Sequence, residues 1–235
     1  MDRRLPPALI GLTPGTLRAG AGFPSVEGAL VAAVSAAAHG GLRGLMIREP
    51  HLEDGAFLRL ARALREAFDG WLCVHDRVHL AEHIGAHGVH LTSRSLPPGA
   101  ARRVVGSRAC LSVSTHADVS APDPSLVDFA LHAPIFCPHS KESAGNEIGR
   151  EGLLAALSSF DVPVVALGGV DPQRLSALKG TGALGCAAIG AIWGTDSAPI
   201  DGALRSPLHD LDAIEARTSA LVRASAASFG VEQVR

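Results

Sequence analysis

The sequence lacks any large excess of charge of one sign. Its 21 Lys and Arg residues stand against 23 Asp and Glu residues, so the net charge is only -2. A protein that is drawn to nucleic acid or to an anionic membrane by its overall field carries a larger, positive charge. We therefore expect neither of these partners, and a small molecule is the partner that this composition favours.

Cysteine pairs and long apolar runs are also missing. The four cysteines are widely spaced and form no CxxC pair, which favours reduced thiols in a cytoplasmic protein over disulfides. The N-terminal stretch MDRRLPPALIGLTPG has only a short apolar run, which predicts neither a signal peptide nor a membrane span. No low-complexity stretch or Pro/Ser-rich linker divides the chain, so we expect residues 1–235 to form one domain.

What the chain does contain is a repeated alternation of short apolar runs with stretches of helical length. We expect strands at 8–12, 42–47, 71–75, 87–91, 109–113, 127–132, 162–167 and 185–190. We expect helices at 25–39, 54–68, 77–85, 98–105, 150–159, 172–179 and 208–224, with a weak one after His116. Eight parallel strands joined by helices close most readily as a TIM (β/α)8 barrel. An open doubly wound sheet is the alternative, although no G-x-G-x-x-G motif follows the first strand.

Glycines follow the last two predicted strands. Gly168 and Gly169 come after the seventh strand, and Gly190 and Ala191 come after the eighth. Barrels commonly bind phosphate between these two loops, because glycine lets backbone N–H groups approach an anion. The pair of turns therefore predicts a phosphate site, with glycines that only turn the chain as the alternative.

Histidines crowd the stretch CVHDRVHLAEHIGAHGVHL at 73–91, which raises the question of a metal cluster. A zinc site needs three or four ligands that converge on one point. The five histidines are divided between strands (His75, His87 and His90) and the helix that separates two strands (His79 and His83). Because such a helix faces outward in a barrel, we expect no metal cluster here. His116 and His139, after the fifth and sixth strands, are the histidines that we expect at the rim.

Six of these segments, in this order, resemble the thiamine phosphate synthase superfamily over about residues 8–194, which leaves 195–235 as a connector and closing helix. GLMIREP is similar to that family's Q-L-R-E-K stretch, VHDRVHLAEHIGAHGVHL to N-D-R-x-x-x-A-x-x-x-G-A-x-G-V-H-L, and SVSTH to G-x-S-x-H. APIFCPHSK is similar to G-x-I-F-x-T-x-S-K, VPVVALGGV to the I-G-G-I strand, and TGALGCAAIGAI to the closing phosphate strand.

The resemblance implies a barrel enzyme of thiamine biosynthesis that handles a thiazole phosphate. In the synthase branch it also implies a pyrimidine pyrophosphate and Mg²⁺. The chain departs from that branch where the pattern has Gln, Lys, Asn and a second metal carboxylate, since these positions are Met46, Pro50, His75 and Ser95. Asp76 is left as the one candidate magnesium ligand. A single carboxylate is a poor magnesium site when the amide side chains and the Lys ammonium group of the synthase pattern are missing too.

The other branch, the TenI-like thiazole tautomerases, keeps the phosphate glycines and the His of G-x-S-x-H without the metal pair. The resemblance makes His116 the general acid/base, a role that suits an imidazole with an ordinary pKa near 6.5. We therefore expect first a metal-independent tautomerase, an isomerase without a cofactor. A synthase, which is a transferase, and a non-catalytic sensor of a thiamine-related phosphate are the alternatives.

The remaining candidate residues bind the ligand. Arg48 would pair with a substrate carboxylate or phosphate, with a structural pair to Glu49 as the alternative. Lys141 lies in the loop CPHSKESAGNE, which either closes over a ligand or is a solvated surface loop. The other candidates are Ser114 in the binding site and, as secondary members, Asp76 (ligand or helix cap) and His139. A homodimer is an open expectation for the assembly.

Overall fold

Eight parallel strands form a closed barrel in sequence order, in a computed structural model that describes residues 5–20, 22–117, 120–137, 147–194 and 207–230. Each strand pairs with the next, and β8 closes on β1 through the register Ile10–Ala187. The strands are β1 (Leu9–Leu12), β2 (Gly44–Ile47), β3 (Trp71–His75), β4 (Gly88–Leu91), β5 (Cys110–Thr115), β6 (Phe129–His132), β7 (Val164–Leu167) and β8 (Gly185–Ala188). The TIM barrel expected from the sequence is confirmed.

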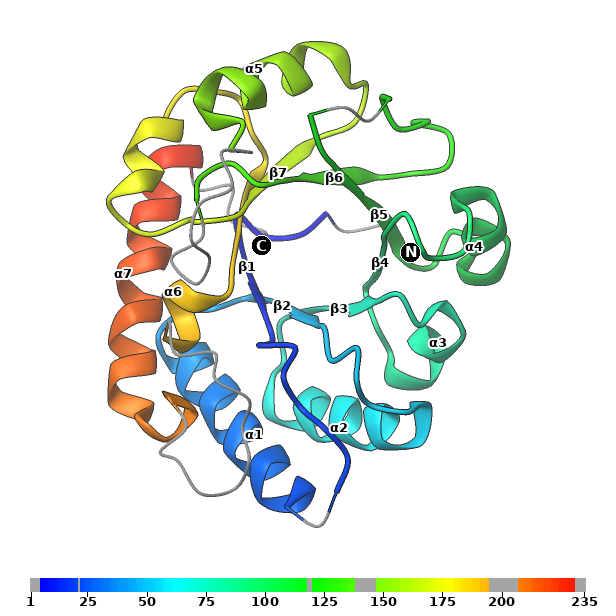
Figure 1. Ribbon diagram of the computed structural model, residues 1–235, viewed down its shortest axis with the longest axis vertical. Coiled ribbons are helices and arrows are strands. Elements are labelled where there is room, and N and C mark those ends of the chain that lie inside the picture. Colours follow the sequence, from blue (N-terminus) through cyan, green and yellow to red (C-terminus); the bar gives the residue numbers. More distant parts are fainter. Residues whose placement is uncertain (1–4, 21, 118–119, 138–146, 195–206, 231–235) are drawn as a thin grey trace.

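Helices surround the ring of strands (Figure 1). They are α1 (Phe23–His39), α2 (Asp54–Ala67), α3 (Ala81–Ile84), α4 (Pro98–Val105), α5 (Gly149–Ser159), α6 (Gly190–Trp193) and α7 (Leu211–Phe229), with short 3-10 turns η1 (Val78–Leu80), η2 (Arg174–Leu178) and η3 (Pro207–His209). Local signals explain several of their ends: α4 begins at a proline, and Asp210 caps α7 by accepting the N–H of Ala213 at 3.0 Å.

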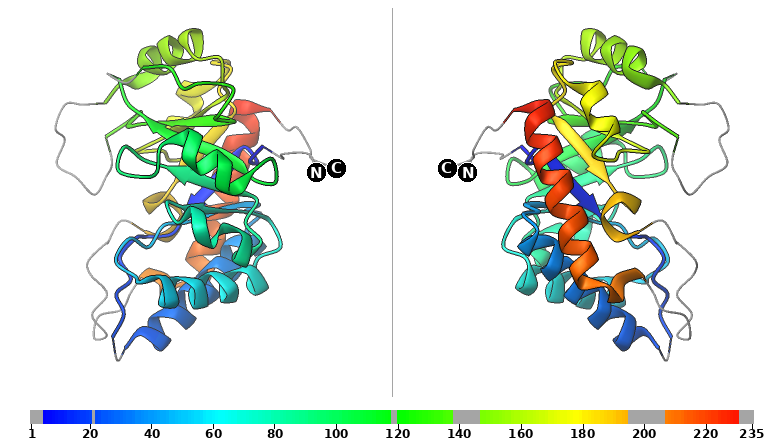
Figure 2. Two further views of the ribbon diagram at one scale, coloured as in Figure 1. Left: turned by 90° about the vertical axis from the view of Figure 1, so that its right-hand side faces the viewer. Right: turned by 90° about the vertical axis from the view of Figure 1, so that its left-hand side faces the viewer.

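The long closing helix α7 runs along the outside of the barrel and packs against α1 (Figure 2). The sequence predicted this helix at 208–224, and it reaches Phe229. The helix predicted at 172–179 is instead the 3-10 turn η2, and the short α6 was not predicted. Residues 195–206, which belong to the connector expected after residue 194, lie outside the described residues.

The expected weak helix after His116 is absent from the described residues 120–128, which form turns and bends. Pro122 and Pro124 explain this, because proline lacks the N–H that a helix interior needs and restricts the residue before it. As a result, described residues 120–128 add no helix beside β5, whose outward side packs against α4.

The barrel interior is filled by alternate residues of the strands, as the two-residue period of a strand requires. This buried set is Ile10, Leu12, Met46, Trp71, Cys73, Cys110, Phe129, Leu131, Val165 and Ala187. None of the four cysteines forms a disulfide, and burial raises the pKa of the Cys73 thiol well above its ordinary value. No helix in the described part of the chain is long and apolar enough to cross a membrane.

Candidate functional site

The candidate residues that the structure describes lie on one rim. Because all strands are parallel, their carboxyl ends meet at the same end of the barrel. Arg48 follows β2, Asp76 follows β3, Ser114 lies near the end of β5, and His116 follows β5. The glycine turns at 168–169 and 190–191 follow β7 and β8. Lys141 and His139 lie outside the described residues.

A buried histidine that was not predicted as a site residue forms the floor of this rim. His90 on β4 is 2% exposed. Its Nδ1 lies 2.9 Å from Ser112 Oγ and its Nε2 lies 2.9 Å from Ser114 Oγ. Ser112 and Ser114 are two residues apart on β5, so both hydroxyls point to the inside of the barrel. The sequence signal that could have predicted His90 is the pair of serines on the inner side of one strand, because their hydroxyls need a buried polar partner on the neighbouring strand.

The imidazoles of His75 and His90 are neutral at physiological pH, because their pKa values are lowered. Burial lowers the pKa of His90 to about 3, with smaller contributions from His75 and Arg48. Burial likewise lowers the pKa of His75 to about 4, and the nearby positive charge of Arg48 adds to this effect. The two rings lie 5.5 Å apart between centroids. A positive charge close to both rings places the Arg48 guanidinium at the mouth.

The alternative that Arg48 forms an ion pair with Glu49 does not hold. The buried Glu49 carboxylate instead accepts the backbone N–H groups of Gly15 and Leu17, each at 2.9 Å. Burial raises the pKa of Glu49, although these two hydrogen bonds oppose the effect. Glu49 therefore fixes the loop after β1 at the rim, and the Arg48 side chain makes no hydrogen bond or ion pair within the described residues.

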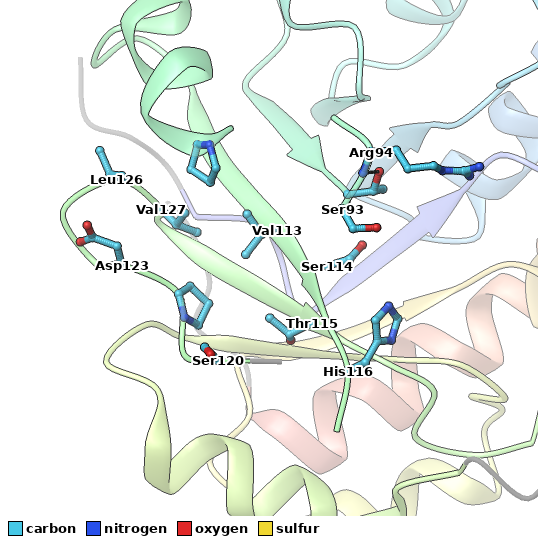
Figure 3. A pocket seen from close by; sticks show the side chains of 13 residues that line it. Ser93, Arg94, Val113, Ser114, Thr115, His116, Ser120, Asp123, Leu126 and Val127 are labelled. Carbon is cyan, nitrogen blue, oxygen red and sulfur yellow. Dashed lines mark hydrogen bonds between the residues drawn. The ribbon is translucent and has the colours of Figure 1, made fainter. Parts of the chain in front are cut away.

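The His116 ring lies on the mouth side of the barrel wall. Figure 3 shows Ser114 and His116 on one side of the end of β5 and Val113 and Thr115 on the other. His116 is exposed, and its Nδ1 lies 2.7 Å from the carbonyl oxygen of Ala133. Because a carbonyl can only accept, we assign the proton to Nδ1, which leaves Nε2 of the neutral ring as a base. His116 thus bonds backbone and still offers a second nitrogen to a ligand.

Asp76 sits in an uncommon backbone conformation. It is the one residue other than glycine in the described part of the chain with a positive φ, at 72°. Its exposed carboxylate makes no hydrogen bond or ion pair with a described residue, and no side chain caps the following turn η1. The structure therefore does not support a helix cap as the role of Asp76, and strain of this kind is more common at functional sites.

The described residues of the rim do not form a magnesium site. The position of the second metal carboxylate is Ser95, and its hydroxyl is turned back to the N–H of Thr92 at 2.8 Å. Of the carboxylates in the segments directly after β2 and β3, Glu49 is committed to two backbone amides, which leaves Asp76. Within the described ranges, no three His, Cys, Asp or Glu side chains are grouped as metal ligands. One carboxylate without supporting ligands does not fit a resident magnesium ion.

The two glycine turns leave backbone N–H groups open at the rim. Gly168 and Gly169 donate no backbone hydrogen bond to a described residue, and Gly190 and Ala191 begin α6, where the first N–H groups have no partner within a helix. Packing also requires a glycine at position 169, because a Cβ there would lie 2.5 Å from the carbonyl oxygen of Cys137. The glycines of this turn therefore serve both explanations: they leave backbone N–H groups open to an anion, and they allow the close packing of the chain.

A cavity of about 490 Å³ opens beside these residues. It is lined by polar groups of the rim, among them Ser93, Arg94, Ser114 and His116, and by apolar residues such as Val113, Leu126 and Val127 (Figure 3). A smaller cavity of about 230 Å³ lies between β6 and α5. Both lie beside the described residues 120–128, which form no helix, and the larger one has the volume of a small-molecule site.

Comparison with known proteins agrees with the motifs. Residues 21–192 match the sequence profile of a family described as thiamine monophosphate synthase. A thiamine-phosphate synthase of Azorhizobium caulinodans is 34% identical over 173 residues, which are 72% of this chain and 82% of that protein. One of Moorella thermoacetica is 31% identical over 184 residues, which are 76% of this chain and 85% of that protein.

A solved structure with the same fold carries a related name. The thiamine phosphate pyrophosphorylase from Pyrococcus furiosus superposes with a TM-score of 0.69 at 21% identity and covers 92% of this chain and 94% of its own. The resemblance inferred from the six segments is confirmed by the match of the family profile. The names of these relatives favour the synthase, which was the alternative expectation from the sequence, over the tautomerase, which was the first expectation.

Proposed function

Because the chain belongs to the thiamine monophosphate synthase family, we propose that it is the transferase that its relatives' names describe. In this reaction a ring nitrogen of a thiazole phosphate attacks a carbon activated by pyrophosphate on a pyrimidine. A carbon–nitrogen bond forms, and the carbon–oxygen bond to pyrophosphate breaks, with its electron pair leaving on pyrophosphate.

One observation supports this proposal over the others: the rim offers anion-binding groups on two different sides. The open amides after β7 and β8 lie on one side, and the unpaired guanidinium of Arg48 after β2 lies on another. Two phosphorylated substrates need two such places, and the names of the relatives favour this use of them over the carboxylate and the phosphate of a tautomerase substrate. The glycine turns would hold the thiazole phosphate by its phosphate group.

The side chains between these two places would orient the rings. Ser114 stands over the floor formed by His90, where its hydroxyl can contact the pyrimidine. Arg48 is suited to the leaving group, because a planar guanidinium binds phosphate oxygens through two parallel hydrogen bonds. Its charge would stabilise the negative charge that grows on pyrophosphate as the carbon–oxygen bond breaks.

A second candidate function, the tautomerase, is favoured by the geometry of His116. Its Nδ1 is engaged by the Ala133 carbonyl, so Nε2 can take a proton from a bound thiazole and return it to another atom. This proton transfer needs one phosphate site and no metal. It is an isomerase reaction on the same ring that the transferase would use.

Two assays on the full chain separate the candidates. The purified protein is incubated with the pyrimidine pyrophosphate and the thiazole phosphate, and thiamine phosphate is measured by mass spectrometry. In parallel, it is incubated with the non-aromatic thiazole carboxylate phosphate, whose conversion is followed by NMR. The proposal expects the coupled product, with slower coupling for Arg48→Gln and folded protein by thermal melting. Tautomer conversion without coupling, abolished by His116→Ala, would replace the proposal with the second candidate.

A further inference from the structure

We propose that Arg94, together with Arg48, binds the pyrophosphate group directly and takes the place of a resident metal ion in this chain. The inference rests on the proposed function for the identity of the anion, and it assigns a binding role to a side chain that the family pattern did not single out. The starting point is that the described residues of the rim do not fit a magnesium ion.

The loop after β4 is built so that residue 95 cannot ligate a cation while residue 94 faces outward. The Ser95 hydroxyl accepts the N–H of Thr92 at 2.8 Å and lies 3.1 Å from the Thr92 hydroxyl. The N–H of Arg94 in turn donates to the Thr92 hydroxyl at 3.3 Å. These bonds close a tight turn from Thr92 to Ser95 and fix the backbone from which the Arg94 side chain extends.

The Arg94 guanidinium has no partner among the residues that the structure describes. It makes no hydrogen bond or ion pair with them, and it is exposed. Arg94 lines the 490 Å³ cavity with Ser114 and His116. Figure 3 shows its side chain extending away from Leu126 and Val127, on the same side of β5 as Ser114 and His116. The guanidinium is therefore available to an anion at the mouth.

Other arginines near this rim are already occupied, which makes the contrast with Arg94 informative. Arg77, directly after Asp76, donates to Asp54 at 3.0 Å and stacks on the ring of Phe57 at 4.2 Å. Arg174, after β7, donates to the carbonyl oxygen of Gly169 at 2.9 Å. Arg48 and Arg94 lack such a partner among the described residues, as does Arg18 in the loop after β1.

Two guanidinium groups carry the same total charge as one magnesium ion, and each can donate two hydrogen bonds to phosphate oxygens. Their charge is fixed at all relevant pH values, because arginine does not lose its proton in proteins. The neighbouring imidazoles of His75 and His90 are neutral, the Glu49 carboxylate is engaged by two backbone N–H groups, and the carboxylates of Asp76 and Asp123 are exposed. A pyrophosphate bound between the two arginines would thus have its charge compensated without a metal.

The test is equilibrium binding of inorganic pyrophosphate by calorimetry, measured on the full chain in EDTA and again with excess Mg²⁺. We expect the wild-type protein to bind pyrophosphate in EDTA, and Arg94→Gln to weaken this binding about 10- to 100-fold, the loss that follows from removing hydrogen bonds to a charged group. The matched control is Arg103→Gln, an exposed arginine on α4 without a partner among the described residues, which should bind as the wild type does. Binding in EDTA that Arg94→Gln leaves unchanged would overturn the proposal.

A second variant tests whether a metal ion can again replace the Arg94 guanidinium. Ser95→Asp, combined with Arg94→Gln, restores a second carboxylate and removes the guanidinium. We expect pyrophosphate binding by this double variant to depend on Mg²⁺. Wild-type protein that binds pyrophosphate only with Mg²⁺ would also overturn the inference.

The inference and the proposed function fail in different ways. If the chain forms the coupled product but binds pyrophosphate only with Mg²⁺, the proposed function stands and the role of Arg94 falls. If it binds pyrophosphate in EDTA through Arg94 but never forms the coupled product, the binding site stands and the transferase falls.

Discussion

His90 Nε2 lies 2.9 Å from Ser114 Oγ at the floor of the barrel mouth, and this bond joins the buried interior to the site. On the other side of the ring, Nδ1 lies 2.9 Å from Ser112 Oγ. A neutral imidazole has one donor and one acceptor, so both nitrogens are satisfied by the two hydroxyls. The orientation of Ser114 toward a ligand thus depends on a histidine that no ligand needs to touch.

Removing the Ser114 hydroxyl should lower the stability of the fold as well as binding. Ser114→Ala leaves the buried His90 Nε2 without its partner, which costs about 1–3 kcal/mol. Urea unfolding of the variant should show this loss. Ser93→Ala, which removes an exposed hydroxyl of the same cavity, should unfold within about 0.5 kcal/mol of the wild type. Equal stability of Ser114→Ala and wild type would contradict the role of this bond.

The stability of the fold should fall as the pH falls from 6.5 toward 4. The folded-state pKa values of His75 and His90 are about 4 and about 3, below the ordinary value of 6.5. In this pH window the unfolded chain binds protons at these rings that the folded chain does not, so acid favours unfolding. Each ring contributes a slope that approaches about 1.4 kcal/mol per pH unit.

The histidine variants test this pH dependence by thermal melting between pH 4 and pH 7. His75→Asn, which places an amide where the synthase pattern has one, should reduce the slope. His51→Asn, an exposed histidine between β2 and α2, should leave it unchanged. A slope for His75→Asn that equals the wild-type slope would show that His75 is protonated in the folded state over this range.

The glycine turn after β7 should be intolerant of a side chain for two separate reasons. Gly169 has a φ of 60°, and an added Cβ would lie 2.5 Å from the Cys137 carbonyl oxygen and 2.6 Å from that of Phe136. Gly180 has a similar φ of 72° but nothing within 4 Å of an added Cβ. Gly180→Ala should therefore cost about 1–2 kcal/mol of unfolding free energy from the backbone conformation alone, and Gly169→Ala should cost clearly more.

Functional loss should follow the same order. Gly169→Ala must displace the turn that carries the open amides, so binding of inorganic phosphate measured by calorimetry should weaken, whereas Gly180→Ala should bind as the wild type does. Unchanged phosphate binding in Gly169→Ala would mean that this glycine serves packing only.

The fold could be predicted from the sequence because the barrel strands are short apolar runs at regular intervals. All eight strands were placed within two residues of their observed starts, for example 71–75 for β3 and 185–190 for Gly185–Ala188. The helix expected after His116 was wrong because Pro122 and Pro124 outweigh the regular alternation of the fold. The short α6 was missed because four residues carry no helical period.

The site could be predicted only where a residue directly follows a strand. Arg48, Asp76 and His116 meet this condition, and so do the two glycine turns. His90 was missed because its partners, Ser112 and Ser114, lie on the next strand along the chain, and this pairing depends on register. The free side chain of Arg94 was missed because it depends on which neighbours other arginines have already taken, such as Asp54 for Arg77. Contacts of this kind are properties of the folded chain.

The most direct test of the central claim, that the rim joins two phosphorylated substrates, is mass spectrometry of the products formed by the purified full chain. The protein is supplied with the pyrimidine pyrophosphate and the thiazole phosphate together, and thiamine phosphate and released pyrophosphate are quantified. The account predicts one pyrophosphate released for each thiamine phosphate formed. Intact precursors after incubation with folded protein that binds both of them would contradict it.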